Sequence, residues 1–292
     1  MKKSYIYAAA SIAVWSTMAT VAKLLLGEMD SYTLLCFSSL FAAAALFVMN
    51  LCSKKLPILK AYRLKDYLLM SAIGLPGVFF YNAFYYEGAS RMPASQAFII
   101  NYLWPIMSII FACVLLKEKM TVRKAIAVLM SFLGVFAVAG NDLIHFNRET
   151  FIGILFCIGA AVSYGLFTAL NKKSSYDTQV SMTVASAASF VLSLCVTLLR
   201  GNTLAVAPAQ LPGILWNGVF TMAVANLTWA LALSSGSTAK ISNLAYITPF
   251  LSLVWTFFIL HEPIQPMSVL GLCIIVAGIF IQLHDPKTSA KH

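Results

Sequence analysis

The chain has 292 residues, of which 60% are apolar and only 10% are charged, and its mean hydropathy is +0.84. Soluble domains carry about 25% charged residues, so this chain has too few charges to cover a surface that faces water. The composition therefore excludes a soluble protein and predicts an integral membrane protein.

Ten apolar segments follow one another along the chain, and each is long enough for a helix to cross a hydrocarbon core of about 30 Å. They lie at residues 4–26, 33–51, 67–87, 94–116, 122–139, 151–171, 179–199, 212–233, 239–260 and 267–283. The segments lack the alternation typical of barrel strands, so we expect an all-α protein with ten transmembrane helices. The length of the first segment favours a retained helix over a cleaved signal peptide.

Lysine and arginine are distributed unequally over the loops. If the N-terminus is cytoplasmic and ten helices follow, 16 of these residues lie on the cytoplasmic side and 4 on the other. The positive-inside rule then predicts that both termini are cytoplasmic. The formal charge of +10 is explained by this asymmetry and by contact with anionic lipids, so nucleic acid is not expected as a partner.

Residues for chemistry or metal binding are sparse. The six cysteines occur singly and form no CxxC pair, and the four histidines lie in loops, at helix ends or in the tail. The sequence contains neither an HExxH motif nor a glycine-rich phosphate loop. We therefore expect no enzyme activity, no metal site and no cofactor.

The chain repeats itself at an offset of 144 residues. Four residues of the fourth span, Tyr102, Pro105, Ser108 and Glu118, correspond to Tyr246, Pro249, Ser252 and Glu262 of the ninth. The same offset relates Asn82 to Asn226. The repeat unit has five helices, and an odd number reverses the second unit in the membrane. We therefore predict two inverted five-helix repeats, at residues 4–139 and 151–283, the architecture typical of alternating access.

Short motifs add a family resemblance. The fourth span closes on Leu-Leu-Lys-Glu-Lys (115–119) and the ninth on Leu-His-Glu-Pro (260–263). With the five-helix repeat, these resemble the drug/metabolite transporter superfamily and its EamA-type ten-helix branch. Asn-Tyr-Leu-Trp-Pro (101–105) and Trp-Ser-Thr (15–17) resemble the bacterial aromatic amino acid exporter subgroup. The resemblance implies a multi-pass exporter in the bacterial inner membrane.

Pro105 and Pro249 lie close to the centres of the fourth and ninth spans. Each removes an amide donor and frees the carbonyl four residues back, at Asn101 and Ala245. A free carbonyl at membrane depth must face protein, water or substrate. We interpret both prolines as hinges, with a static packing kink as the alternative. Pro76-Gly77 predicts a further break in the third span, without a counterpart in the eighth.

Intramembrane amides and deep aromatic rings are the candidate substrate-binding residues, because amides avoid lipid and rings with polar tips both stack and donate hydrogen bonds. For each residue alone, helix packing is the competing interpretation. The candidates are Trp15, Asn82, Tyr85, Asn101, Tyr102, Trp104, Tyr164, Asn226, Trp229 and Tyr246.

No carboxylate falls at the midplane of a predicted span, which disfavours a proton-coupled exporter of cations. The sequence thus favours a secondary transporter of small metabolites, with aromatic or similar neutral or zwitterionic amino acids as the solute class. The expected partners are this small-molecule substrate and the lipid bilayer, and a monomer is the simplest state. The alternatives are a multidrug or cationic-compound exporter of the same fold, and a receptor or channel.

Overall fold

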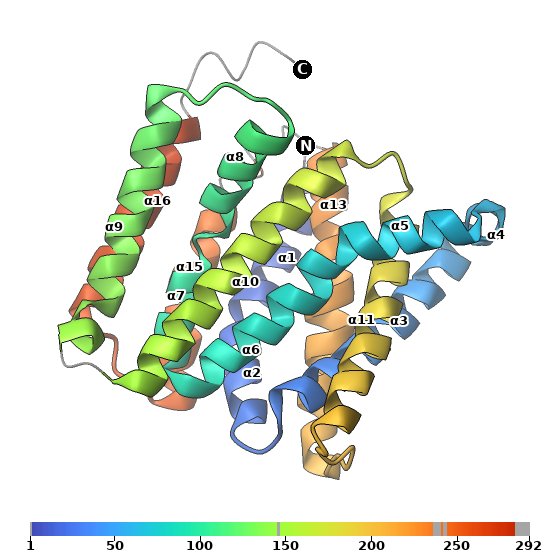
Figure 1. Cartoon of the computed structure of the whole chain (residues 1–292), viewed down its shortest axis with the longest axis horizontal. Coiled ribbons are helices and arrows are strands. Elements are labelled where there is room, and N and C mark those ends of the chain that lie inside the picture. The colour runs from blue at the N-terminus through green and yellow to red at the C-terminus, as the bar shows by residue number, and fades with distance from the viewer. Residues whose placement is uncertain (1, 145–146, 236–240, 242–243, 284–292) are drawn as a thin grey trace.

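The computed structural model describes residues 2–144, 147–235, 241 and 244–283, and these residues contain helices and no strand (Figure 1). The prediction of an all-helical protein is thus confirmed for the described part of the chain. The beginning of the predicted ninth span, with Lys240, and the C-terminal tail lie outside it.

The helices follow one another in two halves, residues 2–144 and 147–283. The first half contains α1 (Lys2–Ser16), α2 (Met18–Leu26), α3 (Ser31–Cys52), α4 (Leu56–Ala61), α5 (Leu64–Leu75), η1 (Pro76–Phe80), α6 (Tyr81–Arg91), α7 (Ala94–Asn101), α8 (Trp104–Leu115) and α9 (Val122–Ile144). The second half contains α10 (Arg148–Lys173), α11 (Thr178–Leu199), η2 (Pro208–Gln210), α12 (Leu211–Leu215), η3 (Trp216–Val224), α13 (Ala225–Ser235), η4 (Ala245–Ile247), α15 (Thr248–Leu260) and α16 (Pro266–Leu283).

Seven helical stretches among the described residues are long and apolar enough to cross a membrane. They are Lys3–Leu26, Ser31–Cys52, Leu64–Arg91, Ala94–Leu115, Arg148–Lys173, Thr178–Leu199 and Pro208–Ala232. Two shorter apolar helices, Ala245–Leu260 and Pro266–Ile281, follow. The chain is therefore a multi-pass membrane protein.

Helices of the two halves pack against each other throughout the bundle, as in the pairs α1 with α13, α3 with α11, α6 with α10 and α9 with α16 (Figure 1). Hydroxyl groups join two of these pairs. Ser39 and Ser189 are 2.8 Å apart between α3 and α11, and Ser11 donates to the Ala225 carbonyl at 2.9 Å between α1 and α13. Such interhelical hydrogen bonds hold helices together where lipid and protein are equally apolar.

Small residues let the backbones approach. A Cβ on Gly134 of α9 would lie 2.6 Å from the carbonyl oxygen of Gly271 in α16, and a Cβ on Gly165 of α10 would lie 2.4 Å from the Cβ of Met107 in α8. Only glycine fits at these crossings, so the glycines fix how closely the helix pairs come together.

Several helices are interrupted inside the bundle. η1 and η3 are π-helical, and they directly precede the helices that carry Asn82 and Asn226. The sequence predicted a break at Pro76-Gly77 without a counterpart, and this expectation is wrong, because residues 216–224 form a π-helix without proline. A π-helical turn needs only a shifted hydrogen-bond pattern, which leaves no residue signature.

Candidate functional site

A cavity of about 130 Å³ lies at the interrupted parts of the helices. Its described lining residues come from both halves of the chain. They are Trp15, Met18, Gly77, Val78, Tyr81, Asn82, Phe98, Asn101, Tyr102, Trp104, Tyr164, Phe167, Met182, Ser186, Thr221, Met222, Asn226, Trp229, Ala245 and Thr248. A site shared by two halves changes shape whenever one half moves against the other.

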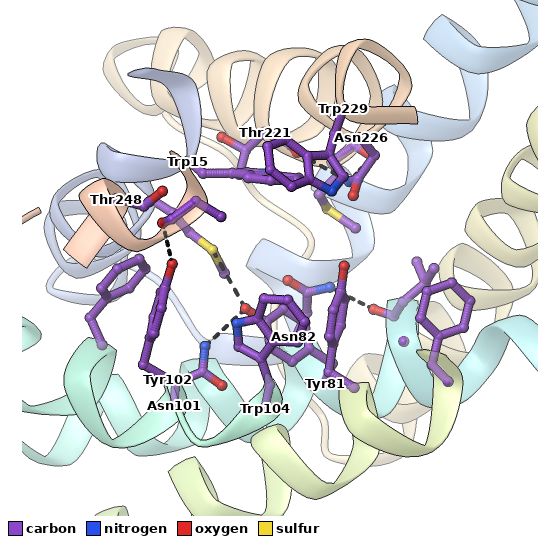
Figure 2. A pocket seen from close by; sticks show the side chains of 18 of the residues that line it. Trp15, Tyr81, Asn82, Asn101, Tyr102, Trp104, Thr221, Asn226, Trp229 and Thr248 are labelled. Carbon is purple, nitrogen blue, oxygen red and sulfur yellow. Dashed lines mark hydrogen bonds between the residues drawn. The ribbon is translucent and has the colours of Figure 1, made fainter. Parts of the chain in front are cut away.

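Two walls face each other across this cavity. Figure 2 shows Trp15, Thr221, Asn226 and Trp229 on one wall and Tyr81, Asn82, Tyr102 and Trp104 on the facing wall, with Thr248 at one side. The rings on each wall pack together: the Trp15 and Trp229 centroids are 5.4 Å apart, and the Tyr164 ring is 4.9 Å from Tyr81 and 5.1 Å from Trp104. This packing fixes the ring positions, so the walls are largely preformed.

The break before Pro105 positions three candidate residues. Helix α7 ends at Asn101 and α8 begins at Trp104, so Tyr102 lies in the turn between them. Because the chain leaves the helical path here, Asn101, Tyr102 and Trp104 all reach the cavity. Asn101 Nδ2 lies 2.9 Å from the Tyr81 hydroxyl, and its buried Oδ1 has no partner among the described residues.

The corresponding break before Pro249 exposes a carbonyl. The short 3-10 helix η4 ends at Ile247 and α15 begins at Thr248, which places Pro249 in the first turn of α15. Pro249 has no amide to donate to the Ala245 carbonyl. This carbonyl accepts hydrogen bonds from the backbone amide of Thr248 and from the Tyr102 hydroxyl, the latter at 2.5 Å. The two proline breaks are thus joined across the cavity by one hydrogen bond.

The described lining is aromatic, thioether and neutral polar, without a charged side chain. Its polar atoms belong to the three amides, to the hydroxyls and to the indole nitrogens. Thr221 Oγ1 is buried and without a partner in the described part of the chain. No three His, Cys, Asp or Glu side chains of the described residues come close enough to hold a metal ion. Such a lining can bind a flat, largely apolar solute through stacking and a few hydrogen bonds.

The structure brings eight of the ten predicted substrate-binding residues to the cavity lining. They are Trp15, Asn82, Asn101, Tyr102, Trp104, Tyr164, Asn226 and Trp229. Tyr85 and Tyr246 do not line it. Tyr85 is fully buried behind Tyr81 and beside Phe98, and the ring of Tyr246 packs on Phe280 of α16 with centroids 5.6 Å apart.

Sequence reasoning left several lining residues out of the candidate set. They are Met18, Tyr81, Phe98, Phe167, Met182, Ser186, Thr221, Met222 and Thr248. Tyr81 and Thr248 directly precede the candidates Asn82 and Pro249, so adjacency was an available signal. The methionines and phenylalanines carried none, because such residues are equally common where helices face lipid.

The fold and the site place the protein among the multi-pass membrane proteins that have an uncharged, aromatic cavity lined by two helical halves. The model of the EamA-like transporter family matches residues 2–140 and 151–283, so the chain belongs to that family. It is consequently a membrane transporter and not an enzyme, as the sequence predicted.

Curated relatives carry transporter names. The uncharacterized transporter YvbV of Bacillus subtilis is 26% identical over 66% of this chain and 64% of that protein, just under two thirds of its length. The uncharacterized inner membrane transporter YhbE of Escherichia coli K12 is 24% identical over 90% of this chain and 86% of its own. A protein of known crystal structure superposes with a TM-score of 0.70 at 19% identity, covering 97% of this chain and 96% of the other, which shows a shared fold.

Proposed function

We propose that the protein is a secondary transporter that exports small neutral or zwitterionic metabolites, with aromatic amino acids as the solute class, by alternating access. The observation that carries the proposal is the cavity, whose described lining is aromatic and uncharged and comes from both halves. An aromatic solute gains stacking there, and an ion finds no opposite charge to offset its desolvation.

The proposed architecture is ten transmembrane helices in two inverted repeats, residues 4–139 and 151–283. Three features support it. The family model matches two segments with nearly these bounds. The π-helix at 76–80 corresponds, at the offset of 144, to residues 220–224 within the second π-helix. Asn82 and Asn226 follow these π-helices at the same offset, and both line the cavity.

The proposed mechanism uses the prolines as hinges and closes one end of the cavity at a time. Glu262, at the end of α15, accepts hydrogen bonds from the backbone amides of Ala94 at 2.8 Å and Ser95 at 3.0 Å, which are the first residues of α7. Nearby, Lys23 donates to the carbonyls of Ala89 and Met92 at 2.7 Å each. The Glu262 contacts tie the two halves together at the end that the lysine and arginine count assigns to the outside, and the Lys23 contacts hold α2 against the end of α6 within the first half.

Ion pairs lie at the opposite end of the bundle. Glu118, which corresponds to Glu262 in the repeat, pairs with Lys124 at 3.0 Å and with Lys172 at 3.1 Å. Lys172 belongs to the second half of the chain, so the pair of Glu118 with Lys172 joins the two halves at this end. The counterparts of Ala94 and Ser95 at the offset of 144, residues 238 and 239, lie outside the described residues. In the proposed orientation the end with Glu262 is external, the end with Glu118 is cytoplasmic, and both termini are cytoplasmic.

The proposed location is the inner membrane of a bacterium, supported by the name of the Escherichia coli relative. Export as the direction follows the resemblance to the aromatic amino acid exporters. A multidrug exporter that carries cations is less well supported, because the described lining offers no carboxylate. A channel or receptor is disfavoured by family membership, since the family is one of transporters.

Counterflow in proteoliposomes tests this proposal. Vesicles loaded with an unlabelled aromatic amino acid should accumulate the labelled solute transiently, and uptake should saturate. A panel of amino acids and organic cations distinguishes the exporter from the cation-carrying alternative. Uptake that rises linearly with solute concentration would indicate a channel and refute alternating access.

A further inference from the structure

The two symmetry-related asparagines of the cavity are held in the same way. Asn82 Nδ2 donates to the Val78 carbonyl at 2.7 Å, four residues back in its own helix. Asn226 Nδ2 donates to the Met222 carbonyl at 2.9 Å, again four residues back, and lies 3.4 Å from the Thr221 carbonyl. Both amides line the cavity, and they lie on facing walls (Figure 2).

The hydrogen-bond partner of each side-chain amide determines which of its atoms remains free for a ligand. A backbone carbonyl accepts hydrogen bonds and cannot donate them, so the amide atom that faces it must be the NH₂ group. The oxygen Oδ1 is therefore the atom that each side chain offers to the cavity. Asn101 is not fixed in this way, because its partner is the Tyr81 hydroxyl, which can either donate or accept.

The bond to the helix carbonyl uses one of the two N–H donors of each NH₂ group, whereas both lone pairs of Oδ1 are left for a ligand. Each of the two facing walls therefore presents an amide oxygen that can accept a hydrogen bond. The described lining adds no carboxylate, but it adds the aromatic faces of Trp15 and Trp229. Aromatic faces attract an ammonium group and repel a carboxylate.

We infer that Asn82 and Asn226 form a subsite that accepts hydrogen bonds from the amino group of the solute. This inference rests on the proposed function and narrows its substrate class to solutes that carry an amine beside an aromatic or apolar body. In an amino acid, the ammonium group lies at the two amide oxygens. A carboxylic acid with the same body but without the amine is bound poorly.

Three probes with one phenyl ring test the subsite: 2-phenylethylamine, phenylalanine and 3-phenylpropionate. Binding is measured by isothermal titration on the purified full-length protein and on Asn82→Leu, which keeps the side-chain size and removes the acceptor. We expect affinity for the amine and for phenylalanine to fall about tenfold, as for a lost hydrogen bond to a charged group. Affinity for the acid should change by less than about twofold in the variant. Asn226→Leu should repeat this pattern from the other wall.

Asn50 provides a matched control. Its Nδ2 also donates to the carbonyl four residues back, Leu46, at 3.0 Å, and to Thr183 at 2.7 Å, but it lies between α3 and α11, outside the cavity lining. Asn50→Leu therefore loses the same kind of hydrogen bond to the carbonyl four residues back, but it leaves the subsite unchanged. It should bind all three probes with the affinity of the unaltered protein.

The inference would be overturned if Asn82→Leu lost as much affinity for the acid as for the amine. It would also be overturned if Asn50→Leu lost affinity for the amine and for phenylalanine but not for the acid. Tighter binding of the acid than of the amine to the unaltered protein would also overturn it. Counterflow of phenylalanine separates the two proposals. If phenylalanine counterflow persists but the Asn82 and Asn226 variants lose no more affinity for the amine than for the acid, only the subsite is refuted. If the protein shows no counterflow and binds none of the three probes, the proposed solute class is refuted as well.

Discussion

The hydroxyl of Tyr102 donates a hydrogen bond to the carbonyl of Ala245 at 2.5 Å. Tyr102 lies at the helix break before Pro105, and Ala245 at the break before Pro249. The equivalent contact in the other direction is not formed, because Tyr246 packs on Phe280. The bond therefore marks an asymmetry between two halves whose sequences correspond.

Tyr102→Phe should lower the transport rate and reduce stability modestly. The change removes only a hydroxyl, and the Ala245 carbonyl keeps its hydrogen bond from the Thr248 amide, so the cost is that of one lost hydrogen bond, about 0.5–1.5 kcal/mol. The measurement is phenylalanine counterflow together with the thermal midpoint of the detergent-solubilised protein. Tyr246→Phe is the matched control, since its ring lies outside the cavity lining, and it should leave both values unchanged. Equal effects of the two variants would argue against a role for the Ala245 contact.

Pro105→Ala should slow transport and preserve membrane insertion. Alanine supplies an amide that can donate to the Asn101 carbonyl, which favours a continuous helix in place of the junction between α7 and α8. Pro249→Ala should act alike through the Ala245 carbonyl, but on the opposite gate. The readout is counterflow normalised to the amount of protein inserted. If both variants transport at the rate of the unaltered protein, the two prolines serve only helix packing and are not hinges.

Gly165→Ala should destabilise the protein. The added Cβ would lie 2.4 Å from the Cβ of Met107 and 2.7 Å from its backbone carbon, so α8 and α10 must separate. Overpacking of this kind costs about 1–3 kcal/mol. The thermal midpoint in detergent should fall by several degrees.

Gly27→Ala is the matched comparison for this variant. At Gly27 the nearest atom to an added Cβ is 3.4 Å away, an ordinary contact. A Gly165→Ala protein as stable as Gly27→Ala would show that this crossing is not tightly packed.

Glu118 should make stability depend on acid pH. Burial disfavours its charged form, but hydrogen bonds and charge interactions with Lys124 and Lys172 outweigh burial and hold the pKa of Glu118 below its ordinary value of 4.5. A carboxylate with a lowered pKa stabilises the folded state above its ordinary pKa, and this contribution is lost as pH falls through the lower value.

The thermal midpoint of the unaltered protein should thus fall further between pH 6 and about pH 3 than that of Glu118→Gln. Glu149→Gln, which alters an exposed carboxylate 3.6 Å from Arg91, serves as the control and should track the unaltered protein. Parallel curves for all three proteins would exclude a contribution from the Glu118 pairs.

Topology is testable with reporter fusions. A reporter fused after His292 should be cytoplasmic, and one inserted between Asn141 and Glu149 should be external, because 16 of 20 lysines and arginines then lie inside. An external reporter at the C-terminus would reverse the proposed orientation.

The amino-acid sequence by itself determined the membrane class, the helical fold and eight of the twenty residues that line the cavity. Long apolar segments with few charges admit only helices in lipid, since every backbone group must be paired within its own segment. Asn82 and Asn226 were predictable because amides avoid lipid, and Trp104 and Tyr102 because they flank a proline that interrupts its helix.

The tertiary structure decided which side chains face the cavity and which face each other. Lipid tails are as apolar as a protein core, so a transmembrane helix carries no amphipathic stripe that would separate Tyr81, in the lining, from Tyr85, behind it. The contacts of Tyr102 with Ala245 and of Glu262 with Ala94 join residues more than 140 positions apart. Such contacts depend on how the two halves pack, and only the folded chain brings these residues within hydrogen-bonding distance.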